Sequence, residues 1–278
     1  MPEEVDLHTT AALCGVEVVT ATRGSSAGPA RLHDRWTLSL LEEGEEVLWH
    51  RGSLEAASSG HVAVYAPGEV EVVLRRASAP TRRTTVCFDR LPDALSLPDG
   101  ASPAPPTKPE VARAVWNVAE LTRSGHRCGD VGSALSTIGA ALAAAPAGAS
   151  SHAEPGAVLR TRRYLQNHAS DRVNLRHLAG LAGVSEGHLV RLFHAWVGVP
   201  PHTYLLQLRV AAARELLADG VPCGATALQA GFADSSHLTR LFRRILGFTP
   251  SQYAKARQVW TTRRLAVPRP TRPQQLAV

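Results

Sequence analysis

Two arginines, Arg191 and Arg240, stand 49 residues apart in two copies of one sequence pattern. A guanidinium group carries five N–H donors in a planar fork, which fits the O6 and N7 acceptors of guanine in the major groove. Each such contact contributes about 1–3 kcal/mol of discrimination against other bases. A phosphate contact or an intramolecular salt bridge is the alternative use of either side chain, and the sequence leaves both open.

The pattern around the two arginines is an internal repeat. When residues 188–204 are aligned with residues 237–253, eight of seventeen positions are identical: His188/His237, Leu189/Leu238, Arg191/Arg240, Leu192/Leu241, Phe193/Phe242, Gly198/Gly247, Pro201/Pro250 and Tyr204/Tyr253. Agreement at this density indicates a duplicated structural unit.

The first copy has the parts of two helices joined by a tight turn. Apolar residues at helical spacing predict a helix over residues 175–182, which Gly183 ends because a left-handed backbone costs glycine little. Ser185 can cap a second helix over residues 186–197 by accepting from its exposed first-turn amides. Its predicted buried stripe is Leu189, Leu192, Phe193 and Trp196, which leaves Gly187, Val190, Arg191 and His194 facing outwards.

The second copy repeats this logic. A helix over residues 225–230, a turn at Gly231 and a cap at Asp234 or Ser235 precede a helix that runs to Leu246. Its predicted outward residues are Ser236, His237, Thr239, Arg240, Arg243 and Arg244. A long helix over residues 204–218 separates the copies. A short helix, a turn and a capped helix with a basic outer face is the geometry that enters a major groove.

The second copy resembles the signature of AraC/XylS-type transcriptional regulators. The resemblance rests on Ala230-Gly231-Phe232, on residues 236–244 (SHLTRLFRR) and on Gly247-Phe248-Thr249-Pro250-Ser251-Gln252-Tyr253, and it covers about residues 157–257. It implies two helices in successive major grooves of double-stranded DNA, with base contacts from Gly187, Val190, Arg191, Ser236, His237, Thr239 and Arg240. Since Gly187 and Val190 carry no side-chain donor or acceptor, we expect the second helix to contribute at least as much specificity.

Other basic residues are expected to contact phosphate or to remain solvated. These are Arg209, Arg243, Arg244, Lys255 and Arg257. The Pro-rich tail over residues 258–278, with Arg263, Arg264, Arg269 and Arg272, is predicted to be disordered and to add non-specific DNA affinity.

Charge is divided unevenly along the chain. Residues 1–156 carry 13 Lys/Arg against 19 Asp/Glu, whereas residues 157–257 carry 13 against 5. This asymmetry favours a polyanion partner for the second half alone, although a solvated basic face would give the same count. Cys14, Cys87, Cys128 and Cys223 are scattered, and with no secretory segment recognised they predict reduced thiols in the cytoplasm. The uncharged residues 131–151 are too weakly apolar to predict a membrane span.

Two stretches rich in Pro, Gly and Ser, residues 97–109 and 146–156, divide the chain. We therefore predict an α+β protein with a sensor barrel over residues 1–97, a helical pair over 110–145, a linker over 146–156 and an all-α DNA-binding domain over 157–257. Short runs at residues 36–41, 46–50, 61–65, 70–74 and 84–88, separated by turns, predict the strands of a barrel or jelly roll. The helical pair can cap this barrel or join two subunits, and the family resemblance favours a homodimer.

The first block also resembles a cupin-like barrel that binds an effector, at His33-Asp34-x-Trp36, the Gly44 turn and Gly60-His61 to Pro67-Gly68. Its candidate effector-binding residues are His33, Trp36, Trp49 and Tyr65, and each is also a plausible core residue. The resemblance implies a histidine within a few residues of Pro67-Gly68, but the next residues are Glu69-Val70-Glu71, so no metal site and no cofactor are expected.

These features favour a sequence-specific transcriptional regulator controlled by a small-molecule effector. The family resemblance favours an activator, which would contact RNA polymerase. The alternative is a regulator whose first domain responds to a protein partner. An enzyme fused to a DNA-binding unit is a third interpretation, but the sequence offers no nucleophile–base pair, no catalytic residues and too little length for a hydrolase-like domain.

Overall fold

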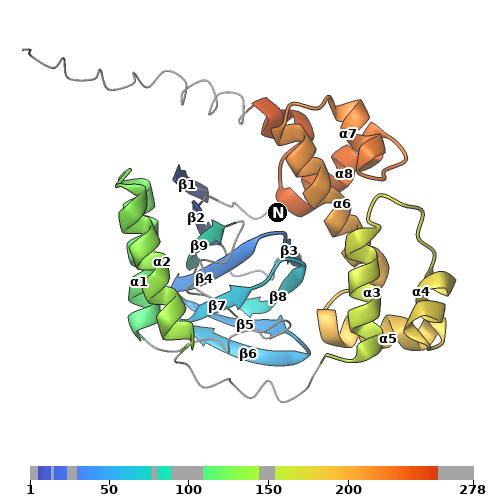
Figure 1. Cartoon of the computed structure of the whole chain (residues 1–278), viewed down its shortest axis with the longest axis horizontal. Helices are drawn as coiled ribbons and strands as arrows, with labels where there is room; N and C mark the ends of the chain where they lie inside the picture. The colour runs from blue at the N-terminus through green and yellow to red at the C-terminus, as the bar shows by residue number, and fades with distance from the viewer. Residues whose placement is uncertain are drawn as a thin grey trace, which may run out of the picture. The chain divides into compact units, whose positions relative to one another are not determined.

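A computed structural model describes residues 6–13, 16–23, 30–76, 80–88, 109–143 and 154–255. Cys14, Arg257, the predicted tail over residues 258–278 and most of the predicted linker lie outside these residues. Within them, strands occupy the first part of the chain and helices the remainder (Figure 1).

The strands form two antiparallel sheets. The first contains, in spatial order, β1 (Asp6–Leu13), β2 (Val16–Arg23), β9 (Thr81–Phe88), β4 (Trp36–Glu43) and β7 (Val62–Tyr65). The second contains β3 (Arg31–His33), β8 (Glu69–Arg76), β5 (Glu45–His50) and β6 (Ser53–Ser58). Within the described residues no strand pair joins the two sheets, so this part is an open β-sandwich. The predicted cupin-like barrel is therefore corrected to a sandwich of two antiparallel sheets, because each sheet keeps two edge strands that no described strand pairs with.

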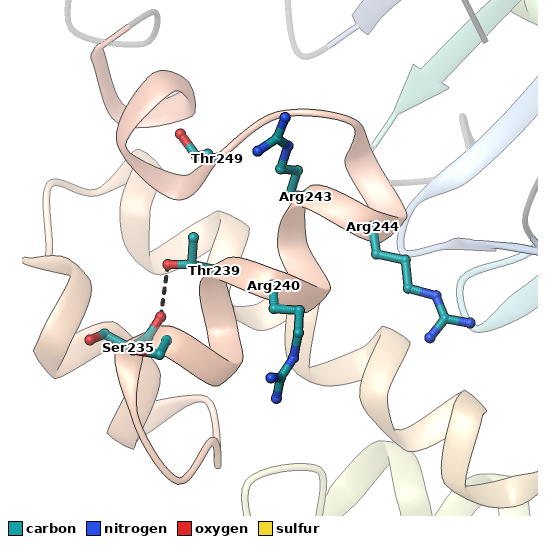
Figure 2. A pocket seen from close by; sticks show the side chains of 7 residues that line it. Ser235, Thr239, Arg240, Arg243, Arg244 and Thr249 are labelled. Atoms are coloured by element: carbon teal, nitrogen blue, oxygen red, sulfur yellow. Dashed lines mark hydrogen bonds between the residues drawn. The ribbon is translucent and has the colours of Figure 1, made fainter. Parts of the chain in front are cut away.

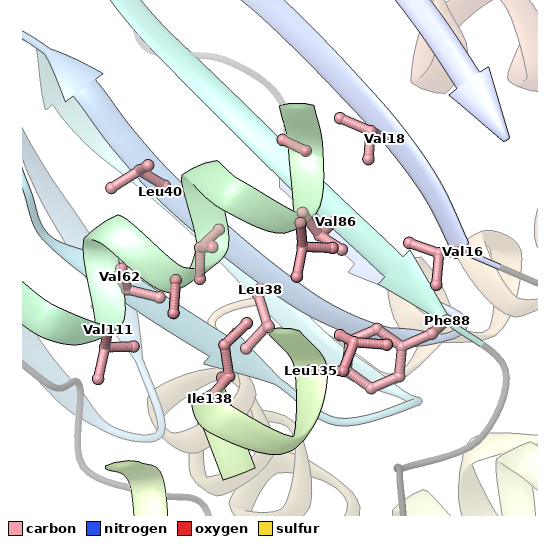
Figure 3. Packing of buried hydrophobic residues seen from close by; sticks show 14 of the residues in the cluster. Val16, Val18, Leu38, Leu40, Val62, Val86, Phe88, Val111, Leu135 and Ile138 are labelled. Carbon is pink, nitrogen blue, oxygen red and sulfur yellow. The ribbon is translucent and has the colours of Figure 1, made fainter. Parts of the chain in front are cut away.

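The five-stranded sheet has an apolar face, covered by a helical pair. Alternate strand residues such as Val18, Leu38 and Val86 point towards α1 (Pro109–Arg123) and α2 (Cys128–Ala143), where Val111 and Ile138 meet them (Figure 3). All five side chains are fully buried. The pair therefore caps the sandwich, which is one of the two roles that its periodicity left open.

The other face of this sheet carries polar side chains that meet the four-stranded sheet. Arg83 on β9 forms ion pairs with Glu46 on β5 and Glu71 on β8, and its guanidinium also donates to Ser39 at 3.1 Å. Arg76 pairs with the same Glu46 at 3.3 Å. Because buried charges are tolerated only when they are paired, the sandwich interior is held by a salt-bridge network on this side.

Helices α3 (Gly156–Asn167), α4 (Leu175–Ala182), α5 (Glu186–Val197), α6 (Pro201–Ala218), α7 (Cys223–Gln229) and α8 (Ser235–Leu246) follow, with a short helix over residues 250–255. The predicted caps are confirmed. The Ser185 hydroxyl accepts from the His188 amide at 3.3 Å, and the Asp234 carboxylate accepts from the His237 amide at 2.7 Å. Gly183 ends α4 with φ at 70°. Helix α6 begins three residues earlier than predicted, with Pro201 at its first position, where no amide donor is needed.

Packing divides the chain into two compact units. Among the described residues, those up to 168 and those from 173 to 208 form the first, which holds the sandwich and the α4–α5 pair; residues 169–172 and 209–255 form the second, which holds the α7–α8 pair. Among the helices described, none is both long and apolar enough to cross a membrane.

Candidate nucleic-acid interface

Helix α8 is divided into a buried and an exposed face. Leu238 and Phe242 are fully buried, and the Phe242 ring lies 6.0 Å from Phe248 and 5.9 Å from Tyr253. This aromatic cluster fixes the rotation of the helix about its axis. The opposite face must then turn to solvent, since residues three and four apart share one side of a helix.

The exposed face of α8 lines an open pocket with a volume of about 610 Å³. Its lining residues are Ser235, Ser236, Thr239, Arg240, Arg243, Arg244 and Thr249. Figure 2 shows the Arg240 and Arg244 side chains extending away from the ribbon. In the described part of the chain, the guanidinium groups of Arg240, Arg243 and Arg244 have no ion-pair partner. Three unpaired cations among hydroxyl groups can bind a polyanion and donate to base edges.

Ser235 and Thr249 also line this pocket, although the sequence does not predict them as DNA contacts. The sequence predicts Ser235 only as a possible helix cap, and Thr249 is named only within the family signature. The Thr249 amide and hydroxyl both bond to the Gln252 side chain, at 2.8 and 3.0 Å. The sequence signal that could have identified Ser235 is its place beside Ser236 at the start of α8, since both residues belong to the first turn of that helix.

Two of the predicted base-contacting side chains have internal partners. The Thr239 hydroxyl donates to the main-chain oxygen of Ser235 at 2.7 Å (Figure 2). The His237 ring packs edge-on against Phe232, with centroids 5.4 Å apart. In this conformation Thr239 offers its methyl group rather than its hydroxyl proton, and His237 is held against the domain.

Helix α5 presents a smaller polar surface. Leu189 and Phe193 are fully buried, whereas Gly187 and Arg191 are exposed and Val190 is half-buried. A Cβ atom added at Gly187 would lie 3.5 Å from Nη1 of Arg191, so the guanidinium lies over the bare first turn. A Cβ atom at this distance would be in ordinary van der Waals contact with the guanidinium, so the Arg191 side chain reaches back along the helix to Gly187.

Arg209 has a different environment from the one predicted. Its guanidinium donates to the main-chain oxygens of Ala169 and Asp171, each at 2.7 Å. Burial lowers the pKa of Arg209. These bonds tie α6 to the loop before α4, so we leave Arg209 out of the proposed DNA surface. Lys255 is exposed at the end of the described residues, and Arg257 lies outside them.

The four candidate effector residues are not brought to one place. His33 and Tyr65 stack inside the sandwich with centroids 4.1 Å apart and an interplanar angle of 5°. Trp36 instead packs against the apolar core beside the helical pair. Trp49 lies near α5, with Cδ1 3.0 Å from the position of a Cβ added at Gly198. Only His33 and Tyr65 therefore share a site.

Charged residues surround the His33–Tyr65 stack. Burial raises the pKa of Glu71, but the charge of Arg83, the hydrogen bond with His33 and other nearby positive charges together outweigh burial and leave that pKa well below the usual value. The Tyr65 hydroxyl donates to Glu71 at 3.1 Å, and burial raises the pKa of Tyr65. Burial also lowers the pKa of His33, which keeps its ring neutral near neutral pH. The stack is therefore a neutral aromatic pair beside a buried carboxylate.

Comparison with known proteins finds likeness chiefly in the carboxy-terminal part. Residues 178–256 match the family model described as "Helix-turn-helix domain". A protein of Photobacterium leiognathi named "Probable transcriptional regulator LumQ" is 29% identical over 91 residues, which are 32% of this chain and 37% of that protein. The transcriptional activator RhaS of Escherichia fergusonii is 34% identical over 97 residues, 34% of each chain. The matched region thus spans about a third of the length of these relatives.

A solved structure extends the likeness in fold to most of the chain. ToxT from Vibrio cholerae O395 aligns with 87% of this chain and 97% of its own, with a TM-score of 0.53 and 10% sequence identity. At this identity the alignment establishes shared architecture only: a β-domain with helices, followed by paired helix-turn-helix units.

Proposed function

The carboxy-terminal domain of this chain belongs to the AraC/XylS family of transcriptional regulators, and from this premise we propose that the whole chain is a sequence-specific DNA-binding regulator. The observation that carries the proposal is the exposed face of α8. There Arg240, Arg243 and Arg244 lie beside Ser236 and Thr239 without ion-pair partners in the described residues.

In this proposal α5 and α8 each enter a major groove. Arg240, Ser236 and the Thr239 methyl group contact bases, while Arg243, Arg244 and Lys255 contact phosphates. Arg191 contacts bases from α5, with Gly187 and Val190 allowing close approach. His237 supports α8 against Phe232, and its ring contacts DNA only at its exposed edge.

We also propose that the β-sandwich carries the controlling signal. The His33–Tyr65 stack is the best-supported place for a small-molecule effector, because it combines two buried rings with the Glu71 carboxylate. A metabolite panel tested by thermal shift on the full chain would reveal it. Capture of a protein partner without any metabolite shift would instead support the alternative effector class.

Activation and self-association complete the proposal. RhaS is named as an activator, and by likeness we propose that this chain also recruits RNA polymerase. We propose a homodimer joined through the outer side of the helical pair, where Trp116 is 46% exposed. Sedimentation of the full chain as a monomer at micromolar concentration would contradict the dimer.

The experiment for DNA binding is selection of bound duplexes from a random library by the full chain. The expected result is an enriched motif, bound by the full chain at least about 10³-fold more tightly than random duplex. An Arg82→Ala variant is the control, because this arginine is exposed on β9 of the β-sandwich, outside the helices proposed to contact DNA and outside the helical pair. Equal binding of selected and random DNA would contradict the proposal.

A further inference from the structure

The β-sandwich contacts the first helix-turn-helix within the first compact unit. The Tyr204 hydroxyl on α6 donates to the main-chain oxygen of Gly68, in the turn between β7 and β8, at 2.8 Å. Gln166 on α3 donates to the same hydroxyl oxygen at 3.2 Å. Gln207, one turn further along α6, donates to the main-chain oxygen of Ala30 at 3.0 Å. Two successive turns of α6 are thus bonded to main-chain atoms of the sandwich.

Glycines allow this close approach. Gly198 ends α5 with φ at +86°, and a Cβ atom there would lie 2.7 Å from Cγ2 of Val72 and 3.0 Å from Cδ1 of Trp49. Val72 is β-branched, so its side chain has little freedom to move away. At Gly52, a Cβ would lie 3.0 Å from the Trp196 ring. The end of α5 therefore packs directly on strands β5 and β8 and on the turn that follows β5.

The repeat supplies an internal comparison. Gly247 occupies the equivalent position at the end of α8, also with φ at +86°, but a Cβ there would meet no atom of the described residues within 4 Å. The glycine at this position is required for backbone conformation in both copies. Among the described residues, only the glycine of the first copy is also required for contact with another element.

The docked turn is continuous with the sandwich interior. The Gly68 amide donates to the main-chain oxygen of His33 at 2.7 Å, and His33 stacks on Tyr65. On the other side, the Tyr204 ring lies 5.5 Å from Phe193, in the core of α5. A short series of contacts thus joins the buried His33–Tyr65 stack to the helix that carries Arg191.

Docking leaves the predicted DNA surface of α5 open. The contacts fall at its carboxy-terminal end and on α6, whereas Gly187 and Arg191 lie in its first half and are exposed. The contact therefore does not cover the base-contacting residues. It fixes α5 and the start of α6 while Arg191 remains available.

We propose that the β-sandwich controls the first helix-turn-helix through this docking contact, and that the docked form is the one that binds DNA. This inference rests on the proposed function, because it concerns the control of DNA binding. A signal that moves His33 or the Gly68 turn releases α6 and lowers affinity. By reciprocity, DNA bound at α5 must stabilise the Gly68 turn.

Hydrogen exchange of the full chain without DNA tests the docking itself. Gly198→Ala is expected to raise amide exchange in residues 66–73 and 201–207 by about fivefold, since the added methyl group separates the surfaces. Gly247→Ala is the matched control, with the same backbone strain and no contact, and should leave both segments unchanged. Equal exchange of these segments in the two variants overturns the docking contact.

A second pair of variants tests the docking contact with smaller changes, which keep each aromatic ring and remove only its hydroxyl group. Tyr204→Phe keeps the ring against Phe193 but removes the hydrogen bond to Gly68, and Tyr253→Phe is its counterpart in the second copy. Tyr204→Phe should accelerate exchange of the Gly68 turn, and Tyr253→Phe should not. The same response to both substitutions contradicts the proposal.

Exchange with the selected duplex present then tests control. In the wild-type chain, DNA should slow exchange of residues 66–73 by about fivefold; Gly198→Ala should abolish this slowing and Gly247→Ala should keep it. Specific DNA binding without any change at residues 66–73 overturns the proposed control and leaves the proposed function intact. Absence of specific binding by the wild-type chain overturns the proposed function, and control of DNA binding with it.

Discussion

The hydroxyl group of Thr239 donates a 2.7 Å hydrogen bond to the main-chain oxygen of Ser235, one turn earlier on α8. The bond occupies the hydroxyl proton, so Thr239 can meet a base edge with its methyl group or with an acceptor lone pair of its oxygen; we assign the contact to the methyl group. Apolar contact with the 5-methyl group of thymine is the readout available to such a side chain.

We therefore expect Thr239→Val to retain most of the affinity for the selected duplex and Thr239→Ser to lose it. The loss should be about 1 kcal/mol, the low end for one base contact. The measurement is fluorescence anisotropy with the selected duplex and with the same duplex carrying uracil for thymine. Replacement of thymine by uracil should weaken DNA binding by the wild-type chain and by Thr239→Val. It should have little further effect on binding by Thr239→Ser. Loss of affinity in Thr239→Val with retention in Thr239→Ser would instead show that the hydroxyl makes the contact.

The two helix caps should contribute measurably to stability. Removal of the Ser185 hydroxyl or the Asp234 carboxylate leaves a first-turn amide without its side-chain acceptor, which costs about 1 kcal/mol for each alanine substitution. Urea unfolding followed by circular dichroism gives the change in free energy. Ser136→Ala, on the exposed side of α2, is the control and should change it by no more than about 0.5 kcal/mol. A control as damaging as the cap variants would argue against the capping role.

Stability should depend on His50 at alkaline pH. Burial alone would lower the pKa of His50, but its contacts with Glu55 and Glu69 raise it to about 9. Because this folded pKa lies above the unfolded value of 6.5, the stabilisation is complete below pH 6.5 and lost as pH rises to about 9. Urea unfolding across this range should show the decline, and His50→Gln should flatten it. An unchanged alkaline slope in His50→Gln would contradict this assignment.

His33 should act in the opposite direction. Burial lowers its pKa below 6.5, so below that pH the unfolded chain binds a proton that the folded chain does not. Stability should therefore fall as pH decreases below 6.5, and His33→Gln should reduce that slope. The comparison is made by urea unfolding under the same conditions as for His50. If the free energy of unfolding falls as steeply below pH 6.5 in the variant as in the wild-type chain, another group controls this pH dependence.

The helices of the DNA-binding part were predictable because their signals are local. Gly183, Ser185 and Asp234 mark helix boundaries within one or two residues of the turns that they stabilise. Strands β1, β2, β3 and β6 were not identified. The β6 strand lies at a sheet edge with mostly exposed side chains, so its sequence carries little of the alternation that identifies a strand.

The exposed face of α8 was predictable for the same reason. The outward face of α8 followed from helical periodicity around Leu238 and Phe242. The internal bonds of Arg209 were not predictable, because its partners, the main-chain oxygens of Ala169 and Asp171, lie about 40 residues away in the chain. Likewise, Trp36 and Trp49 were grouped with His33 by residue type alone, whereas strand order places them in different surroundings.

The most direct test of the account is the affinity of Arg240→Ala for the selected duplex and for random duplex, measured at one fixed salt concentration. Arg243→Ala is the matched comparison, since both side chains are exposed on α8 and Arg243 is assigned to phosphate. If Arg240 contacts a base, its loss costs about 1–3 kcal/mol on the selected duplex and much less on random DNA, whereas Arg243→Ala weakens both alike. Equal weakening of both duplexes by Arg240→Ala would contradict sequence recognition by this face of α8.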